Sequence, residues 1–220
     1  MAEEFQVEQL ISHILFVGKG IALTSQLLAG AIAIGIVLGT LFSILRHNNI
    51  AVFFINNLVS ILRGTPLILQ LSFVYFAVPG IIEMRMSILT AGILAFGINS
   101  SAYIAEILRA GIQSVPKGQF EAAKTLKIPA FYMWKDIILP QVIRNVFPAM
   151  VNEIIALLKE TAIISVIGGV DIMRSAEMLS ATQFTYFVPL CIAACYYYGL
   201  VILIEYIGKK VEKKVFYAKY

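Results

Sequence analysis

The sequence predicts an all-α, polytopic membrane protein with a single domain. Of its 220 residues, 60% are hydrophobic and only 14% are charged, whereas a soluble domain normally carries about 25% charged residues. Several uncharged stretches approach the roughly 20 residues that a bilayer-crossing helix needs. The first ten residues are acidic rather than basic, so we expect no cleavable signal peptide.

The first expected span covers residues 20–45, which contain no charge. Before it, residues 1–19 mix apolar and acidic side chains, which indicates an interfacial helix or a loose terminus. Gly35 and Gly39 form a GxxxG pair inside the span, a spacing that lets two membrane helices approach closely. The alternative is that glycine is simply common in such helices.

The next two spans are expected at residues 66–82 and 86–108. The short apolar run 50–62 is either a surface helix or the start of a kinked second span. Thr65 is a plausible N-cap and Pro66 a natural first helical residue, and Pro79-Gly80 is expected to break the helix.

Residues 114–140 form the longest polar, charge-bearing segment of the chain. Pro116 can open a helix that Ile128-Pro129 ends, and that helix is too short and too charged to span. Its apolar residues recur at helical spacing and are expected to share one face: Phe120, Ala123 and Leu126.

An aromatic-rich piece follows at residues 131–139, with Trp134 as an interfacial anchor. Pro140 is then expected to open the fourth span, residues 141–158, and the fifth covers 186–207. One domain, residues 1–220, therefore contains five spans.

The placement of lysine and arginine predicts the orientation. Residue 46, residues 109–144 and the C-terminal tail together hold twelve of the 17 basic residues, and the positive-inside rule puts this side in the cytoplasm. The other five are Lys19, Arg63, Arg85, Lys159 and Arg174. With five spans, the N-terminus is then outside and the C-terminus cytoplasmic.

Enzyme chemistry is not expected in this chain. It contains no Gly-x-x-x-x-Gly-Lys-Ser/Thr sequence and no His, Cys and carboxylate cluster with metal-ligand spacing. No nucleophile and base can be paired from its polar residues. Cys191 and Cys195 are interpreted as small buried hydrophobes. We expect no cofactor, metal or nucleic-acid partner for the chain itself.

The polar segment resembles the EAA loop of ABC-importer membrane subunits. The pattern is Glu121-Ala122-Ala123, three residues, position 127, nine residues, then Ile137-x-Leu139-Pro140. Lys127 stands where that family usually has glycine, which eases a tight helix-to-turn transition.

Two further blocks resemble the polar amino acid permeases within that family, of the histidine, glutamine, glutamate, arginine and opine type. They are Arg63-Gly64-Thr65-Pro66-Leu67 with Gln70, and Ala102-Tyr103-Ile104-Ala105-Glu106 followed by Arg109-Ala110-Gly111. A looser match lies at 159–168, and the resemblance covers about residues 15–210.

The resemblance implies the type I (MetI-like) permease fold and a location in the bacterial inner membrane. It implies a separate ATPase subunit that binds ATP and Mg²⁺, a second identical or related permease subunit, and an extracytoplasmic substrate-binding protein. The segment 114–140 would be a coupling segment that docks into the ATPase through these residues: Phe120, Glu121, Ala122, Ala123, Leu126 and Lys127.

A polar side chain inside a span is a candidate for the substrate pathway. Glu153 is the main candidate, because a charge at mid-bilayer costs at least about 2.5 kcal/mol and faces the protein interior or a pathway. Asn152, Asn99, Ser100 and Ser72 are further candidates, although such residues also join helices by hydrogen bonds. Glu153 itself could instead be protonated or paired with another helix.

The acidic Glu153 favours a basic amino acid substrate such as arginine, lysine or histidine. Glutamine, glutamate or an opine is the alternative within the family. From a different class, a channel or membrane scaffold subunit without ATP-driven transport is the alternative function.

Overall fold

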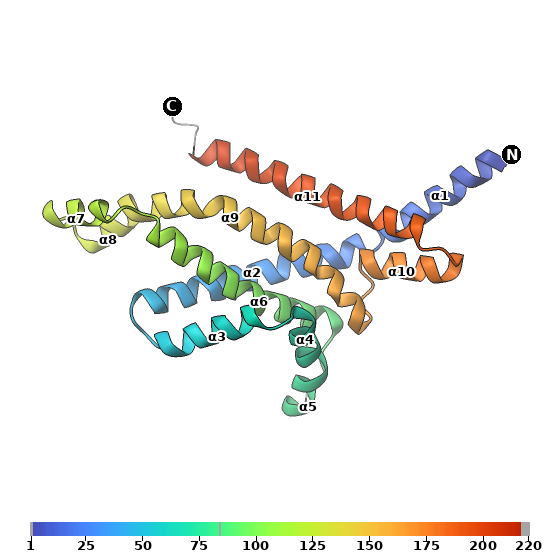
Figure 1. The fold of residues 1–220 in the computed structure, drawn as a ribbon, viewed down its shortest axis with the longest axis horizontal. Coiled ribbons are helices and arrows are strands. Elements are labelled where there is room, and N and C mark those ends of the chain that lie inside the picture. Colours follow the sequence, from blue (N-terminus) through green and yellow to red (C-terminus); the bar gives the residue numbers. More distant parts are fainter. Residues whose placement is uncertain (1, 84, 217–220) are drawn as a thin grey trace.

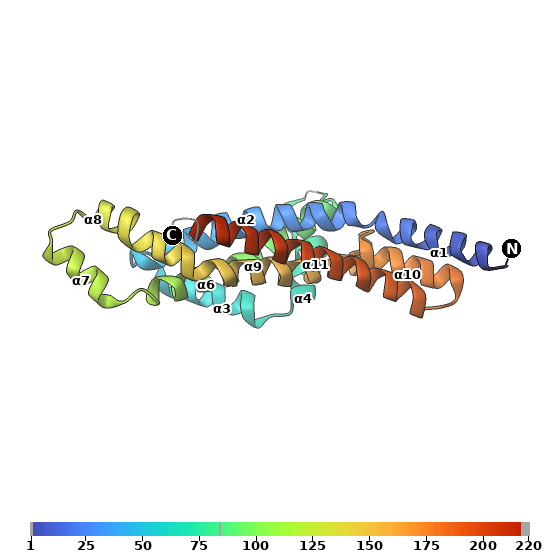
Figure 2. The same ribbon diagram turned by 90° about the horizontal axis from the view of Figure 1, so that it is seen from above.

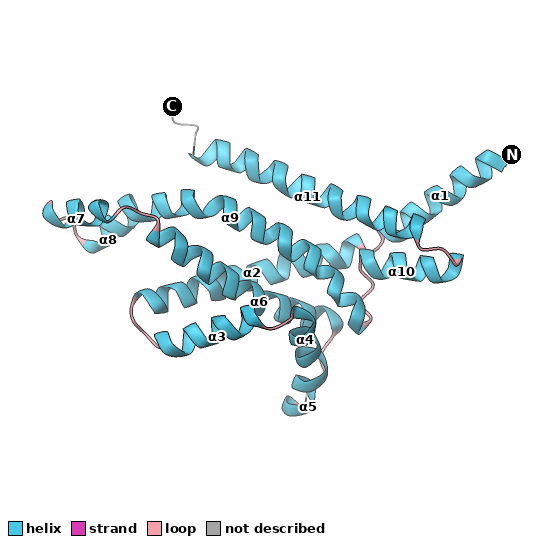
Figure 3. Ribbon diagram, viewed as in Figure 1, coloured by secondary structure: helices cyan, strands magenta, loops and turns pink. Residues whose placement is uncertain are grey.

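The computed structural model describes residues 2–83 and 85–216, and for residues 2–6 and 216 it describes the backbone only. Lys219 of the predicted basic tail lies outside the described residues. Throughout the described part every regular element is a helix (Figure 3), so the predicted all-α class is confirmed.

The molecule is an elongated, narrow bundle (Figures 1 and 2). Its helices follow in this order: α1 (Ala2–Gly18), α2 (Ile21–His47), α3 (Val52–Gly64), α4 (Leu67–Ser72), the π-helical turn η1 (Phe73–Ala77), α5 (Val78–Ile82), α6 (Ile88–Gln113), α7 (Lys117–Thr125), α8 (Ala130–Tyr132), the π-helical η2 (Met133–Ile138), α9 (Leu139–Glu160), the 3₁₀-helical η3 (Thr161–Ile167), α10 (Ile172–Gln183) and α11 (Phe187–Phe216). α7 and α8 lie at one end of the bundle, with α1 and α10 at the other (Figure 1).

Among the described residues, three helical stretches are long and apolar enough to cross a membrane: Val7–His47, Ile88–Gln113 and Phe187–Val215. The pair α3 and α4–α5 would add a fourth if its two arms, bent by 104°, count as one broken span. α9 is the remaining predicted span, and it carries several polar residues. The prediction of five spans is therefore approximate.

The helices extend past several of the predicted span limits. Residues 2–18 form a helix that leads into α2 after a short break, so the helical stretch that contains the predicted span 20–45 begins well before residue 20. Pro79-Gly80 does not break the second span, because α5 continues to Ile82 and ends where Glu83 adopts a left-handed conformation. α6 and α11 run five and nine residues beyond the predicted ends at 108 and 207.

The helix that contains α9 does not begin at Pro140. α8, η2 and α9 follow each other without a break from residue 130 to 160. In the π-helical turn η2, the N–H of Leu139 donates to the carbonyl oxygen of Trp134, five residues back. This wider turn changes the hydrogen-bonding pattern where Pro140 lacks an N–H, so the proline is accommodated within the helix.

α2 and α6 pack against each other along the centre of the bundle, and the GxxxG pair lies in this interface. A Cβ atom on Gly39 would lie 2.8 Å from the Ile104 side chain and from the Ser101 carbonyl oxygen, and one on Gly35 would lie 3.1 Å from Ser100 Oγ. The predicted close approach at these two glycines is confirmed.

A smaller core closes the opposite end of the bundle, where α1, α10 and α11 meet. Asp171 caps α10 by accepting a hydrogen bond from the Arg174 N–H, 2.8 Å away, and its other carboxylate oxygen accepts one from the Tyr197 hydroxyl, also at 2.8 Å. Burial raises the pKa of the Asp171 carboxyl, and these hydrogen bonds oppose the rise.

Neighbouring Cys191 and Cys195 are exposed, so their prediction as buried residues was wrong within this single chain.

Candidate functional site: a polar helix interface and the coupling segment

Glu153 of α9 faces α6 in the middle of the bundle. Its Oε1 accepts a hydrogen bond of 2.6 Å from the Ser100 hydroxyl, and Ser100 is fully buried while Glu153 is half-buried. Ser100 is neutral, so this bond orients the carboxylate without balancing its charge. Two of the predicted pathway residues, far apart in sequence, are thus brought together.

Asn99 stabilises the bend between α3 and α4 by hydrogen bonds. Its Nδ2 donates to the Leu62 carbonyl oxygen and to Gln70 Oε1, both at 3.1 Å. Gln70 Nε2 in turn donates to the Leu62 oxygen at 2.8 Å and to Thr65 Oγ1 at 2.8 Å. These amides satisfy backbone groups that the broken helix leaves open, which is a requirement for irregular backbone at membrane depth.

The bend itself lies one residue from its predicted place. Thr65 is the last, extended residue after α3 rather than an N-cap, and Pro66 precedes the first residue of α4. Proline disfavours helical geometry at the residue before it. Thr65 is therefore extended, and the helix is interrupted there. From the sequence, Gln70 is placed only in a family motif, and its position five residues after Thr65 is the signal that could have indicated its role at the bend.

Ser72 and Asn152 lie elsewhere. The Ser72 hydroxyl donates to the Ile68 carbonyl oxygen of its own helix, at 2.8 Å. Asn152 is exposed and lines a cavity of about 290 Å³ between α9 and α11, together with Glu205. Neither residue is placed in the Ser100–Glu153 contact.

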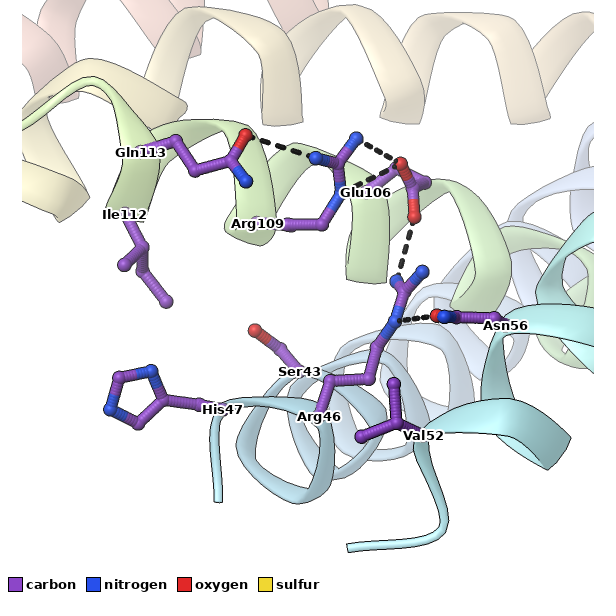
Figure 4. Close-up of a pocket in the computed structure, with 9 residues that line it drawn as sticks. All are labelled: Ser43, Arg46, His47, Val52, Asn56, Glu106, Arg109, Ile112 and Gln113. Atoms are coloured by element: carbon purple, nitrogen blue, oxygen red, sulfur yellow. Dashed lines mark hydrogen bonds and ion pairs between the residues drawn. The ribbon is translucent and has the colours of Figure 1, made fainter. Parts of the chain in front are cut away.

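Glu106 of α6 forms ion pairs with three arginines at a level of the bundle nearer to α7, and Figure 4 shows two of them, Arg46 and Arg109. Its Oε1 lies 2.7 Å from Arg46 Nη1, and its Oε2 lies 2.6 Å from Arg109 Nη2 and 3.6 Å from Arg63 Nη1. Structural pairing or lipid contact is the role that the sequence predicts for Arg63, Glu106 and Arg109, and the structure shows the pairing. However, the assignment of Arg63 to the side opposite Arg46 and Arg109 was wrong, because α3 folds back beside α6.

A cavity of about 720 Å³ connects this arginine cluster with the two helices that carry Ser100 and Glu153. Tyr103, with the Arg63 guanidinium 5.5 Å from its ring centre, lies one turn beyond Ser100 on α6. Asn145 and Ala149 lie two turns and one turn before Glu153 on α9. These spacings put the cavity walls on the helix faces of Ser100 and Glu153.

The coupling segment begins with α7, whose inner face is fixed by packing. Ala123 is buried and Phe120 half-buried, and both belong to a core that includes Met133 and Ile138. The Phe120 and Trp134 rings lie 6.1 Å apart, and Trp134 also meets the His47 ring edge-on at 4.8 Å. Trp134 thus joins α7 to the end of α2.

The outer face of α7 is formed by the other candidate coupling residues. Glu121, Ala122, Leu126 and Lys127 are all exposed, Leu126 by 73%. The predicted single apolar face therefore holds for Phe120 and Ala123 and fails for Leu126, because the chain already leaves the helix at Leu126.

Lys127 ends α7 in the conformation that glycine favours. Its φ is +53°, its N–H donates to the Lys124 carbonyl oxygen at 2.9 Å, and the Ile128 N–H donates to the Ala123 oxygen at 3.0 Å. This pair of bonds is a Schellman motif. The turn expected with glycine is thus formed with lysine in its place.

Comparison with known proteins identifies the family. Residues 31–217 match the family described as the inner membrane component of binding-protein-dependent transport systems. The chain belongs to this family. It is therefore a transmembrane permease subunit, a class that works with an ATPase and a substrate-binding protein.

Relatives of this permease cover nearly its full length. A candidate glutamine transport system permease of Rickettsia typhi is 50% identical over 204 residues, 92% of this chain and 94% of that protein. The arginine transport system permease of Bacillus subtilis is 42% identical over 207 residues, 93% of this chain and 94% of that protein.

Solved structures agree with the permease fold. An amino acid ABC transporter, crystallised with histidines, matches with a TM-score of 0.86 and 34% identity, over 94% of this chain and 97% of that chain. An inward-facing methionine ABC transporter matches with a TM-score of 0.71 and 18% identity, over 96% of this chain and 98% of that chain. The second likeness concerns the fold alone. The predicted MetI-like fold is confirmed.

Proposed function

We propose that this permease subunit imports a polar amino acid, driven by ATP hydrolysis in partner subunits. We further propose that Glu153 contacts the substrate. The observation that carries the proposal is the Ser100–Glu153 pair, a carboxylate held at mid-bundle by a neutral hydroxyl. A carboxylate in that position attracts the α-ammonium group of an amino acid or a cationic side chain.

The cavity beyond Tyr103 supplies the route from this site. It begins at Tyr103 and Ala149, one turn from Ser100 on α6 and one turn from Glu153 on α9, and extends along these two helices toward the α7 end. A substrate leaving Glu153 would pass Arg63, whose guanidinium can meet an α-carboxylate. The route thus offers groups of both signs to a zwitterion.

The partners in this proposal follow from the family. ATP and Mg²⁺ bind the ATPase subunits, which engage the exposed face of α7. A second permease subunit, identical or related, completes the pathway, and a substrate-binding protein delivers the amino acid. The α7 end then faces the cytoplasm, with the N-terminus outside. ATP binding would shift the assembly between inward-open and outward-open states.

The substrate class has two candidates. Glu153 favours arginine, lysine or histidine, and the arginine permease of Bacillus subtilis is consistent with this choice. The relatives in Rickettsia, named for glutamine, favour glutamine. A carboxylate can bind the α-ammonium group of either substrate. A test must therefore distinguish the two by their side chains, which are cationic in arginine and neutral in glutamine.

The test is uptake of arginine and of glutamine by proteoliposomes that contain the assembled transporter. We expect Glu153→Gln to reduce arginine uptake at least tenfold, because a charge-assisted contact contributes about 1.5–3 kcal/mol. Glu205→Gln, a carboxylate on α11 away from Ser100, is the matched control and should transport normally. Unchanged uptake of both amino acids by Glu153→Gln would refute the proposed contact. A loss of glutamine uptake alone would assign glutamine as the substrate.

A further inference from the structure

A cavity, which we call the wedge, opens between the ends of α2 and α6 that lie nearest α7. Its polar half, about 560 Å³, is drawn in Figure 4 and lined by Arg46, Glu106 and Arg109, among others. Its apolar half, about 450 Å³, is lined by Ile44, Leu108 and Trp134, among others. Three residues line both halves, so the two are continuous: Ser43, His47 and Ile112.

The polar half carries unbalanced positive charge. Arg46 and Arg109 line this half and share the single carboxylate of Glu106 with Arg63, which lines the other cavity, so the charged side chains that line the polar half leave a formal charge of +1. Both oxygens of Glu106 are already occupied. The side chains of Arg46 and Glu106 are only 15% and 18% exposed, so water screens this charge incompletely. Arg46 donates from Nε to Asn56 and from Nη1 to Glu106, and Arg109 donates from Nε and Nη2 to Glu106 and from Nη1 to Gln113. Each Nη nitrogen carries two N–H groups, so both guanidinium groups keep N–H donors for a phosphate.

The two halves together favour one kind of occupant. A free phosphate or a carboxylate would fill the polar half alone and leave the apolar half open to water. Phe53 and Phe54, beside the wedge residue Val52, are 73% and 74% exposed and present an apolar surface next to the opening. An anionic head joined to a hydrocarbon chain matches the charge of one half and the apolar lining of the other.

We propose that this wedge binds an anionic phospholipid, with its phosphate against Arg46 and Arg109 and an acyl chain along the apolar half. The location of the wedge agrees with a membrane lipid as its occupant, because the wedge lies at the end of the bundle that the basic residues assign to the cytoplasm. Basic pockets between membrane helices on that side bind anionic headgroups. The site is distinct from the substrate contact at Glu153, and its test does not depend on transport.

The binding test uses the purified full-length chain, stripped of lipid in a neutral detergent. Phosphatidylglycerol, phosphatidylcholine and soluble glycerol phosphate are added separately, and bound lipid is counted by native mass spectrometry. We expect phosphatidylglycerol to be retained roughly fivefold better than phosphatidylcholine, and glycerol phosphate not to compete at equal concentration. Equal retention of the two lipids, or full competition by glycerol phosphate, would overturn the proposal.

Two variants with a matched control locate the site. Arg46→Gln removes a charge that lines the wedge, whereas Arg63→Gln removes one that pairs with the same Glu106 but lines the other cavity. We expect Arg46→Gln to lower phosphatidylglycerol retention about fivefold and Arg63→Gln to lower it less than twofold. Ile112→Trp fills the shared part of the wedge and keeps every charge, so it should also release the lipid, even if Arg46→Gln fails to fold. Equal losses in the two arginine variants, or full retention by Ile112→Trp, would contradict the proposal.

Discussion

Replacing Lys127 by glycine should stabilise the end of α7. Lys127 has a φ of +53°, and a side chain in the left-handed region costs roughly 1–2 kcal/mol. Glycine removes that cost but loses about 0.5–1 kcal/mol through the greater freedom of the unfolded chain. The net gain is roughly 0.5 kcal/mol, or about a twofold increase in the protection of α7 amides from hydrogen exchange.

Lys124 provides the matched control for this change. It has the same side chain and lies three residues earlier, inside the regular part of α7. There glycine costs about 1 kcal/mol relative to a good helix former, so Lys124→Gly should reduce amide protection about fivefold. The two substitutions remove the same charge from the same segment and should act in opposite directions.

Hydrogen–deuterium exchange with mass spectrometry, on peptides that cover residues 117–128, measures both variants. A loss of protection in Lys127→Gly similar to that in Lys124→Gly would refute the reasoning, because it would mean that the lysine side chain holds the turn. Contact of Lys127 with the ATPase remains a separate prediction, and unaltered ATPase affinity in Lys127→Gly would remove it.

Two further pairs of substitutions test the packing of the bundle and of α7. Gly39→Ala should lower thermal stability by about 1–3 kcal/mol, because its Cβ would press on Ile104 at 2.8 Å, whereas Gly199→Ala, with nothing within 4 Å, should raise it by up to about 1 kcal/mol; equal melting temperatures would contradict this. Phe120→Ala should loosen α7 and increase its hydrogen exchange, since Phe120 packs on Trp134. Leu126→Ala, at an exposed position, should leave that exchange unchanged and weaken only binding to the ATPase. The reverse pattern would mean that the two faces of α7 are wrongly assigned.

The sequence predicts the helices well where a local signal exists. Uncharged runs locate α2, α6 and α11, and Pro116 locates the start of α7, because proline and charge act on the residues beside them. Pro79 and Pro140 misled the prediction, since a proline near the first turn of a helix, or next to a π-helical turn, is accommodated.

Contacts between distant segments could be predicted only in part. Glu153 was found because a carboxylate is rare in a span, but its partner Ser100 is one of several serines and becomes visible only when α6 and α9 are packed. Asn152, adjacent to Glu153 in sequence, points to α11 instead, as neighbours on a helix diverge by about 100°. The cluster around Glu106 likewise requires the 104° bend after α3, which the apolar run 50–62 left undecided.

The coupling segment and the Glu153 site are joined by a single helical path. From residue 130 to residue 160, α8, η2 and α9 are continuous, and Trp134 at one end packs on α7 while Glu153 lies near the other. α6 packs tightly against this path at Gly111, where a Cβ would collide with the Val146 side chain. Packed interfaces of this kind shift as units rather than deform continuously. We therefore expect a displacement of α7 to reach the Ser100–Glu153 contact through movement of α6 and α9 together, and not through a change at Glu153 alone.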